Sequence, residues 1–472
     1  ERGFTSGMKH YGGTLLVDGD NSAATGAVTV AAGTTLGGTG VIGGAVTVPT
    51  GGTITGGTLG TIGSPDAGDI GPLTVASLSL SGGTFQADLV DDTADQIRSG
   101  GTIDLQDPVP GLLALNAAGA TTPGTAFRLI DNTAAGPITD MFQNVAEGHV
   151  TAFNGTTGYY SYLAGTGNDF SLTTSGPAVY TEMEGGADFE LRLLDTSPED
   201  TLQLLRNGDV VDSRRYDLVT AYTVNGIGGQ TDTLTVNYAA SGGFFDIPVT
   251  FDGGAGGNDS LSIIGGSFID VILNHTAAHS GTLDLDGTVI TYAGLEPVLI
   301  GVGGLNLTVN LTAGDDTTQF SMLDADADTL VDDLSILSLT GTHESTTVLD
   351  IGGYSSLTIY GGAGDDRLLL AAFTPGVFSG DLAIDGGGQT DFVLLGTALS
   401  VASLEVTAAA TVLNADITTS GGGDVTIDSA GWIGDSITID TSAGGGGDVS
   451  FTGTVSGLSV SPDLSLNAGT DG

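Results

Sequence analysis

The chain has 472 residues, of which 80 are glycine, and it contains no cysteine, which excludes a disulfide framework and any metal site with thiolate ligands. Nine Lys and Arg against 56 Asp and Glu give a formal net charge of −47. Nucleic acid and anionic membranes are therefore poor partners, and divalent cations are good ones. No apolar run approaches the roughly 20 residues of a membrane-spanning helix, so we expect no direct membrane insertion.

The first elements repeat closely. Gly26-Ala-Val-Thr-Val returns as Gly44-Ala-Val-Thr-Val, eighteen residues later. Val and Thr alternate with a period of two, which predicts strands, and eighteen residues is too short for a domain. The spacing favours a chain that winds and stacks on itself.

A second phrase recurs further along, in the form apolar-x-apolar-x-Gly. It reads "LSIIG" at Leu261, "LDLDG" at Leu283, "LSLTG" at Leu337, "LTIYG" at Leu357 and "LAIDG" at Leu382. We interpret each copy as a strand followed by a corner at the glycine. "LTVNLTAGDD" aligns without gaps on "LTIYGGAGDD", 50 residues later, and this offset predicts two coils.

Variable spacing between fixed corners predicts an all-β fold, a parallel β-helix (solenoid) with variable coils of about 18–30 residues. A β-propeller needs blades of roughly 40 to 50 residues, and a sandwich needs hairpins. Neither fits the observed spacings.

Five regions follow from the changes in pattern: 1–107 and 108–175, both β-rich repeats, 176–250, 251–400 with Gly-rich turns, and 401–472 with further repeats. The region 176–250 holds several arginines and alternates charge with leucine. It is either a charged β-rich insertion or a set of wider coils.

The text from about Gly12 to Leu105 resembles the β-strand repeats of autotransporter passenger domains. The tail, with "DITTSGGGDVTIDS", is similar to the repeats of filamentous-haemagglutinin-like adhesins. Both resemblances imply that the predicted parallel β-helix is right-handed and that the protein is bacterial and is secreted or displayed on the cell surface.

A third resemblance is to the calcium-binding nonapeptides of repeats-in-toxin proteins, whose pattern is G-G-x-G-x-D-x-U-x. "GGAGDDRLL" from Gly361 matches every fixed position, and two imperfect copies start at Gly254 and Gly386. The resemblance implies Ca²⁺ as a cofactor, held by carboxylates and by carbonyls of the glycine turn. The implied ligands are Asp259, Asp365, Asp366, Asp391, Gly361 and Gly364. A simple turn whose aspartate closes an Asx-turn is the alternative interpretation.

A separate acidic cluster, "DADADTLVDD", begins at Asp324. Asp324, Asp326 and Asp328 occupy positions 1, 3 and 5 of a calcium loop, and Asp332 occupies position 9. Thr329 stands where the loop needs glycine, and Ser335 where it needs glutamate. An inserted acidic surface loop is therefore the alternative to a calcium site.

His275 and His279 are separated by four residues, which would pair them on a helix. The surrounding text predicts strand and turn, so we expect polar loop histidines rather than a metal pair.

The predicted function is that of a secreted or cell-surface structural protein, a rod, stalk or extracellular fibre, and not of an enzyme. Because both ends lie within the strand pattern, we expect head-to-tail self-association. An adhesin that binds glycans or other surface proteins is one alternative. A polysaccharide lyase or hydrolase is another, and a groove with stacked aromatic side chains and an arginine beside paired aspartates would favour it.

Overall fold

The computed structural model describes residues 8–106, 108–164, 168–196, 199–326, 330–458 and 461–469. The chain divides into two compact units. The first comprises residues 1–179 and 193–222, and the second residues 180–192 and 223–472.

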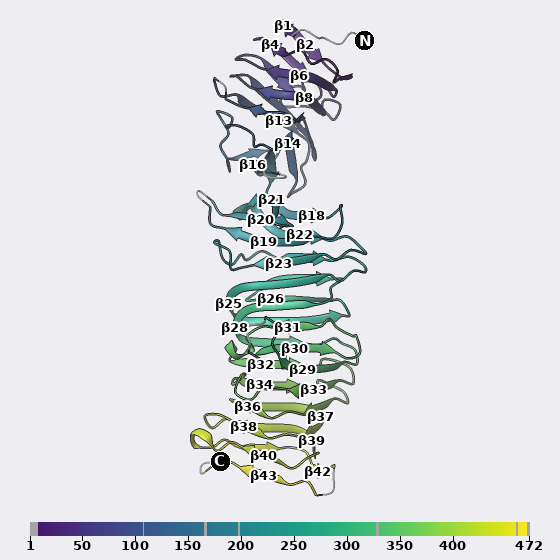
Figure 1. Ribbon diagram of the computed structural model, residues 1–472, viewed down its shortest axis with the longest axis vertical. Helices are drawn as coiled ribbons and strands as arrows, with labels where there is room; N and C mark the ends of the chain where they lie inside the picture. The colour runs from purple at the N-terminus through teal and green to yellow at the C-terminus, as the bar shows by residue number, and fades with distance from the viewer. Residues whose placement is uncertain are drawn as a thin grey trace. The chain divides into compact units, whose positions relative to one another are not determined.

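The fold is all-β, as predicted (Figure 1). Among the described residues, helical segments are limited to three 3-10 turns, η1 (Tyr216–Leu218), η2 (Ile351–Gly353) and η3 (Ala443–Gly445).

The strands up to residue 174 all belong to the first unit. They are β1 (Met8–His10), β2 (Gly13–Leu16), β3 (Asp20–Asn21), β4 (Val28–Val30), β5 (Thr34–Gly37), β6 (Val41–Thr47), β7 (Thr53–Thr55), β8 (Pro72–Ser79), β9 (Thr84–Val90), β10 (Thr93–Ala94), β11 (Gln96–Ser99), β12 (Ile103–Asp104), β13 (Leu112–Ala118), β14 (Ala126–Asn132), β15 (Val150–Phe153), β16 (Thr156–Ala164) and β17 (Asp169–Thr174).

Five strands follow in the charged region: β18 (Gly176–Thr181), β19 (Asp188–Leu194), β20 (Thr201–Arg206), β21 (Asp209–Arg215) and β22 (Val219–Asn225).

The remaining strands belong to the second unit. They are β23 (Thr233–Asn237), β24 (Val249–Asp252), β25 (Ser260–Ala277), β26 (Ser280–Leu285), β27 (Thr288–Ala293), β28 (Val298–Asn310), β29 (Thr317–Leu323), β30 (Asp333–Ser338), β31 (Thr346–Val348), β32 (Ser356–Tyr360), β33 (Arg367–Ala372), β34 (Asp381–Asp385), β35 (Phe392–Leu395), β36 (Leu399–Val401), β37 (Leu404–Leu413), β38 (Ile417–Thr419), β39 (Val425–Ile433), β40 (Ile437–Asp440), β41 (Val449–Phe451), β42 (Val455–Gly457) and β43 (Leu464–Asn467).

Several sequence repeats pair as parallel neighbours. Val28 lies opposite Val46, so the eighteen-residue repeat is in register. Leu307 of β28 lies opposite Leu357 of β32. The 50-residue offset is therefore one step between adjacent strands and not the two coils that we predicted.

The predicted right-handed parallel β-helix with variable coils of about 18–30 residues is wrong, because the sheets are mixed. In the first unit β15, β16, β17 and β14 form a consecutive antiparallel arrangement. In the second unit β25, β26 and β27 form one antiparallel meander, and β29, β30 and β31 form another. The chain reverses direction at these places instead of continuing to a next coil.

Asx-Gly turns are the physical reason for two of these reversals, β15–β16 and β26–β27, and for a further one between β20 and β21. Asn154-Gly155, Asn207-Gly208 and Asp286-Gly287 all have positive φ at both residues and each closes a two-residue hairpin loop. Such turns match the twist of paired antiparallel strands. The phrase "LDLDG" at Leu283 is thus a strand followed by a hairpin turn, and not by a corner.

Alternating apolar side chains form the core of each unit. Leu234 and Val236 of β23 are fully buried, and their neighbours in the strand are only partly buried. The first unit adds aromatic packing, in which the rings of Tyr162 and Phe170 lie 4.5 Å apart. Each buried side chain of this size contributes roughly 1.5–3 kcal/mol to folding.

Candidate metal centre

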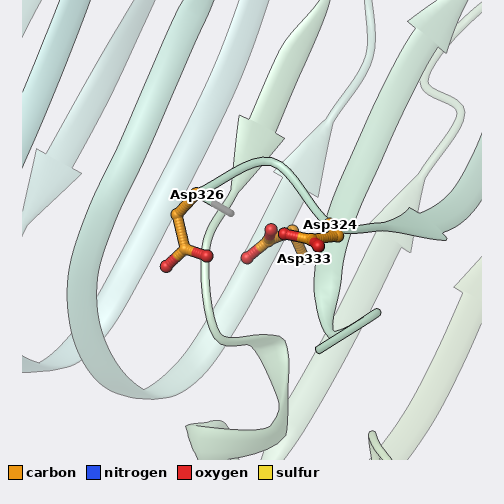
Figure 2. Close-up of side chains that lie close together, drawn as sticks. All are labelled: Asp324, Asp326 and Asp333. Atoms are coloured by element: carbon orange, nitrogen blue, oxygen red, sulfur yellow. The ribbon is translucent and has the colours of Figure 1, made fainter. Parts of the chain in front are cut away.

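The acidic cluster lies in the loop of an antiparallel hairpin in the second unit. Leu323 and Asp333 form the last pair of β29 and β30, so Asp324 follows one strand and Asp333 begins the other. Carboxylate oxygens of Asp324, Asp326 and Asp333 all lie within 4.8 Å of one another. In Figure 2 the carboxylates of Asp324 and Asp333 lie together, and that of Asp326 faces them.

Asp333 anchors this loop. Its side chain is fully buried, and it accepts hydrogen bonds from the backbone N–H groups of Ala325 at 2.5 Å and Asp350 at 3.0 Å. Asp324 and Asp326 are exposed. Two solvated carboxylates therefore meet a third whose position is determined by the main chain.

The ligand set is one of hard oxygen donors without nitrogen or sulfur. Calcium and magnesium prefer such donors, and calcium also accepts an irregular arrangement. Three carboxylates at this separation repel one another, and a divalent cation between them would offset that repulsion. The residues present therefore fit calcium.

The sequence predicted two of these three residues. The structure brings Asp324 and Asp326 together, while Asp328 lies outside the described residues. The third group is Asp333, which the EF-hand-like spacing missed. Recognition of the hairpin would have found it, because Met322 and Leu334 carry the apolar alternation of the two strands up to the loop, where they lie opposite each other.

The nonapeptide aspartates lie elsewhere, in turns between strands of the second unit. Asp316, Asp366 and Asp391 are at most 1% exposed. An oxygen of Asp391 accepts the backbone N–H of Asp366 at 3.0 Å, and an oxygen of Asp366 accepts that of Asp316 at 2.7 Å. We call these three residues the corner ladder.

Asp316 is the last residue of the corner ladder, and its side chain contacts Thr312 of the same turn. Asp316 accepts the backbone N–H and the hydroxyl of Thr312, each at 2.9 Å. Its other oxygen and one oxygen of Asp366 are buried and have no hydrogen-bond partner among the described residues. The ladder thus ties together turns that are 25 and 50 residues apart in sequence.

A shorter ladder of the same kind contains Asp259 and Asp232. An oxygen of Asp259 accepts the backbone N–H of Asp232 at 2.7 Å, and both side chains are fully buried. Asp232 in turn accepts the N–H groups of Ala187 and Ile227, each at 2.8 Å. The second oxygen of Asp259 has no hydrogen-bond partner in the described part of the chain.

Burial dominates the electrostatics of these corners. It raises the pKa of Asp366 to about 6, with the charges of Asp316 and Asp391 as further causes. Burial likewise raises the pKa of Asp259. The hydrogen bonds from the main chain act in the opposite direction but do not cancel the desolvation.

The other predicted nonapeptide ligands surround the ladder. Asp365 is exposed, and one of its oxygens accepts the N–H of Thr390 at 3.1 Å. Gly361 is needed because a side chain there would meet Gly386 and Asp366. Gly364 has a φ of 128°, and a Cβ added at this position would lie 2.6 Å from the carbonyl oxygen of Gly314. A larger residue would therefore not fit at position 364. Calcium binding by these residues stays a prediction.

The prediction of a polar loop histidine is wrong for His275. His275 lies within β25, is 3% exposed and has no hydrogen-bond partner at either ring nitrogen. Its ring lies 4.4 Å from that of His343. His279 is exposed in the following turn, and its Nδ1 lies 3.2 Å from Glu344.

Comparison with known proteins gives no relative: no protein-family model, no curated protein and no solved structure matches this chain. The resemblances to autotransporter, haemagglutinin-like and repeats-in-toxin repeats therefore stay predictions. In the described part of the chain, no helix has the length and apolarity to cross a membrane.

Proposed function

We propose that this protein is a non-catalytic structural protein, secreted by a bacterium or displayed on its surface, and that calcium stabilises it. The observation that carries the proposal is the corner ladder. Side chains of one turn bind the main chain of the next, so that Asp391, Asp366 and Asp316 add cross-links to the hydrogen bonds of the parallel strands. A chain built in this way resists local opening, which suits a stalk or fibre.

The hairpin loop supports the calcium part of the proposal. A site with few charged ligands in a surface loop falls in the weak range of calcium affinities, about 10⁻⁴ to 10⁻³ M, that extracellular modules use. With 56 acidic residues against nine basic ones, bound cations also relieve the repulsion within the protein. Both arguments favour an exterior location, where calcium is abundant.

Self-association is part of the proposal. Strand β43 is an outer strand of its sheet, and Leu466 on it is 52% exposed. An unpaired strand edge with an apolar side chain can add a strand from another copy. Head-to-tail stacking would then lengthen the assembly.

Negative-stain electron microscopy tests this function. The purified chain is imaged in roughly 2 mM CaCl₂ and, separately, in EDTA. This calcium concentration lies above the affinity range of about 10⁻⁴ to 10⁻³ M for extracellular modules. Ordered fibres with a constant axial repeat would support a filament subunit. Single particles in both conditions would contradict the fibre and favour an adhesin that acts alone.

A further inference from the structure

Arg367 is an isolated positive charge in an acidic part of the sequence. It is the only Lys or Arg after residue 215, in a part of the chain that is otherwise strongly acidic. Its side chain is exposed, and its guanidinium makes no ion pair or hydrogen bond with the described residues. Its backbone N–H donates to the carbonyl of Asp316 at 2.8 Å, which holds it beside the corner ladder.

Arg367 lies in a groove of about 600 Å³ within the second unit. On the sheet, Thr317, Arg367, Phe392 and Ala410 form one row across β29, β33, β35 and β37. The groove is wide enough for several sugar rings or another ligand of similar size.

Carboxylates and hydroxyls line the rest of this groove, namely Asp315, Thr340, Asp365, Thr390 and Asp391. Asp315 accepts the N–H of Asp365 at 3.0 Å, and Asp365 accepts that of Thr390 at 3.1 Å. Each uses one oxygen for the main chain. The second oxygen makes no hydrogen bond with the described residues, so it can accept one from a ligand.

Asp391 is the deepest of these acceptors. It is 1% exposed, yet it lines the groove. One oxygen accepts the N–H of Asp366, and the other makes no hydrogen bond with the described residues. A carboxylate oxygen of a groove-lining side chain that has no donor can accept one from a ligand.

We propose that this groove binds a sugar chain that carries a single carboxylate. The planar guanidinium of Arg367 matches a carboxylate in a two-bond arrangement. Asp315, Asp365 and Asp391 accept hydroxyl hydrogens, and the ring of Phe392 contacts the apolar face of a sugar. The net charge of −47 repels ligands with many negative charges, so the anion is single.

The test uses a trisaccharide with one uronate, glucuronosyl-xylobiose, and its methyl ester. Binding to the full chain is measured by titration calorimetry in EDTA, so the result does not depend on calcium or on the proposed structural function. We expect the acid to bind at least tenfold more tightly than the ester. Arg367→Ala should lose that preference, and Arg367→Lys should keep part of it.

Glu405→Gln is the matched control, since Glu405 is an exposed charge on β37 outside the groove. It should bind the acid as the wild type does. Equal binding of acid and ester, or unchanged binding by Arg367→Ala, would overturn the proposal. A change of oligomeric state in Arg367→Ala, seen by sedimentation without a change in sugar binding, would overturn it in favour of a contact between copies.

Discussion

The second unit uses aspartate in two opposite ways. In the corner ladder, Asp366 is fully buried and accepts a main-chain N–H from the neighbouring turn. In the hairpin loop, Asp324 and Asp326 are exposed and converge with Asp333. In both places the sequence combines alanine with closely spaced aspartates. The comparison shows that spacing alone does not separate an aspartate that closes a turn from one that can hold a cation.

The largest expected effect is on the pH dependence of the free energy of unfolding, which should differ between wild type and Asp366→Asn. In the folded protein the pKa of Asp366, about 6, lies above the ordinary aspartate value of 3.8, so the folded protein binds this proton more tightly. The stability from Asp366 is therefore fully present below pH 3.8 and is lost as pH rises through 6. Relative to its value at pH 2, wild type at pH 8 should lose about 3 kcal/mol that Asp366→Asn does not lose.

Urea unfolding across this pH range measures the effect. Asp365→Asn, which changes an exposed neighbour, is the matched control and should follow the wild type. Parallel pH curves for wild type and Asp366→Asn would show that the corner carboxyl is not desolvated.

Calcium should distinguish the loop from the corners. If Asp324, Asp326 and Asp333 hold the ion, calcium at a hundred times its Kd should stabilise the folded protein by about 2.7 kcal/mol. Asp326→Asn should abolish most of this gain in a thermal unfolding measurement. Asp366→Asn should keep it.

Asp435→Asn serves as the control for charge alone, because Asp435 is exposed and distant in sequence from the loop. A calcium effect that survives Asp326→Asn but disappears with Asp366→Asn would move the site to the corner ladder.

The corner ladder itself is tested by comparing two variants at one position. Asp366→Ala removes the acceptor of the Asp316 N–H, whereas Asp366→Asn keeps an oxygen there. An orphaned buried N–H costs about 1–3 kcal/mol, so the alanine variant should be less stable by about 2 kcal/mol. Equal urea midpoints would show that water replaces the lost acceptor and that the ladder adds no stability.

The smallest expected change in stability concerns the buried pair of His275 and His343. The hydroxyl of Thr318, on β29, is hydrogen-bonded to His343 at 2.7 Å. Burial lowers the pKa of His275 to about 3, with His343 as a second cause. Its contribution to stability is present above pH 6.5 and is lost as pH falls toward 3. At pH 5.5 wild type should lose about 1.4 kcal/mol that His275→Phe retains.

Unfolding at pH 7.5 and 5.5 checks this prediction. His149→Phe is the control, since His149 is exposed and should leave the acid sensitivity unchanged. An unchanged pH dependence in His275→Phe would mean that the imidazole is hydrated in the folded protein.

Much of the local structure could be predicted from the sequence. The alternation identified β-strands, and the in-register repeat of Val28 and Val46 was correct. The direction of the chain was not predicted, although Asp286-Gly287 is a strong hairpin signal. We interpreted its glycine as a corner because the neighbouring phrases ended in the same way.

The candidate metal site was predicted only in part, because the hairpin that completes it was not recognised. Asp324 and Asp326 follow from their spacing, but Asp333 joins them only through the hairpin pairing of Leu323 with Asp333. The groove of Arg367 depends on residues from four strands, and no local pattern brings these together.

By itself, the sequence determined the all-β class, the acidic surface and the positions of turns, because strand periodicity and glycine conformations are local properties. Only the tertiary structure decided which strands are neighbours, as when β28 pairs with β32 across 50 residues. It also decided which aspartates are buried. The physical reason is that main-chain hydrogen bonds are the same for every strand, so partners are selected by loop closure and by the packing of side chains far apart in the chain.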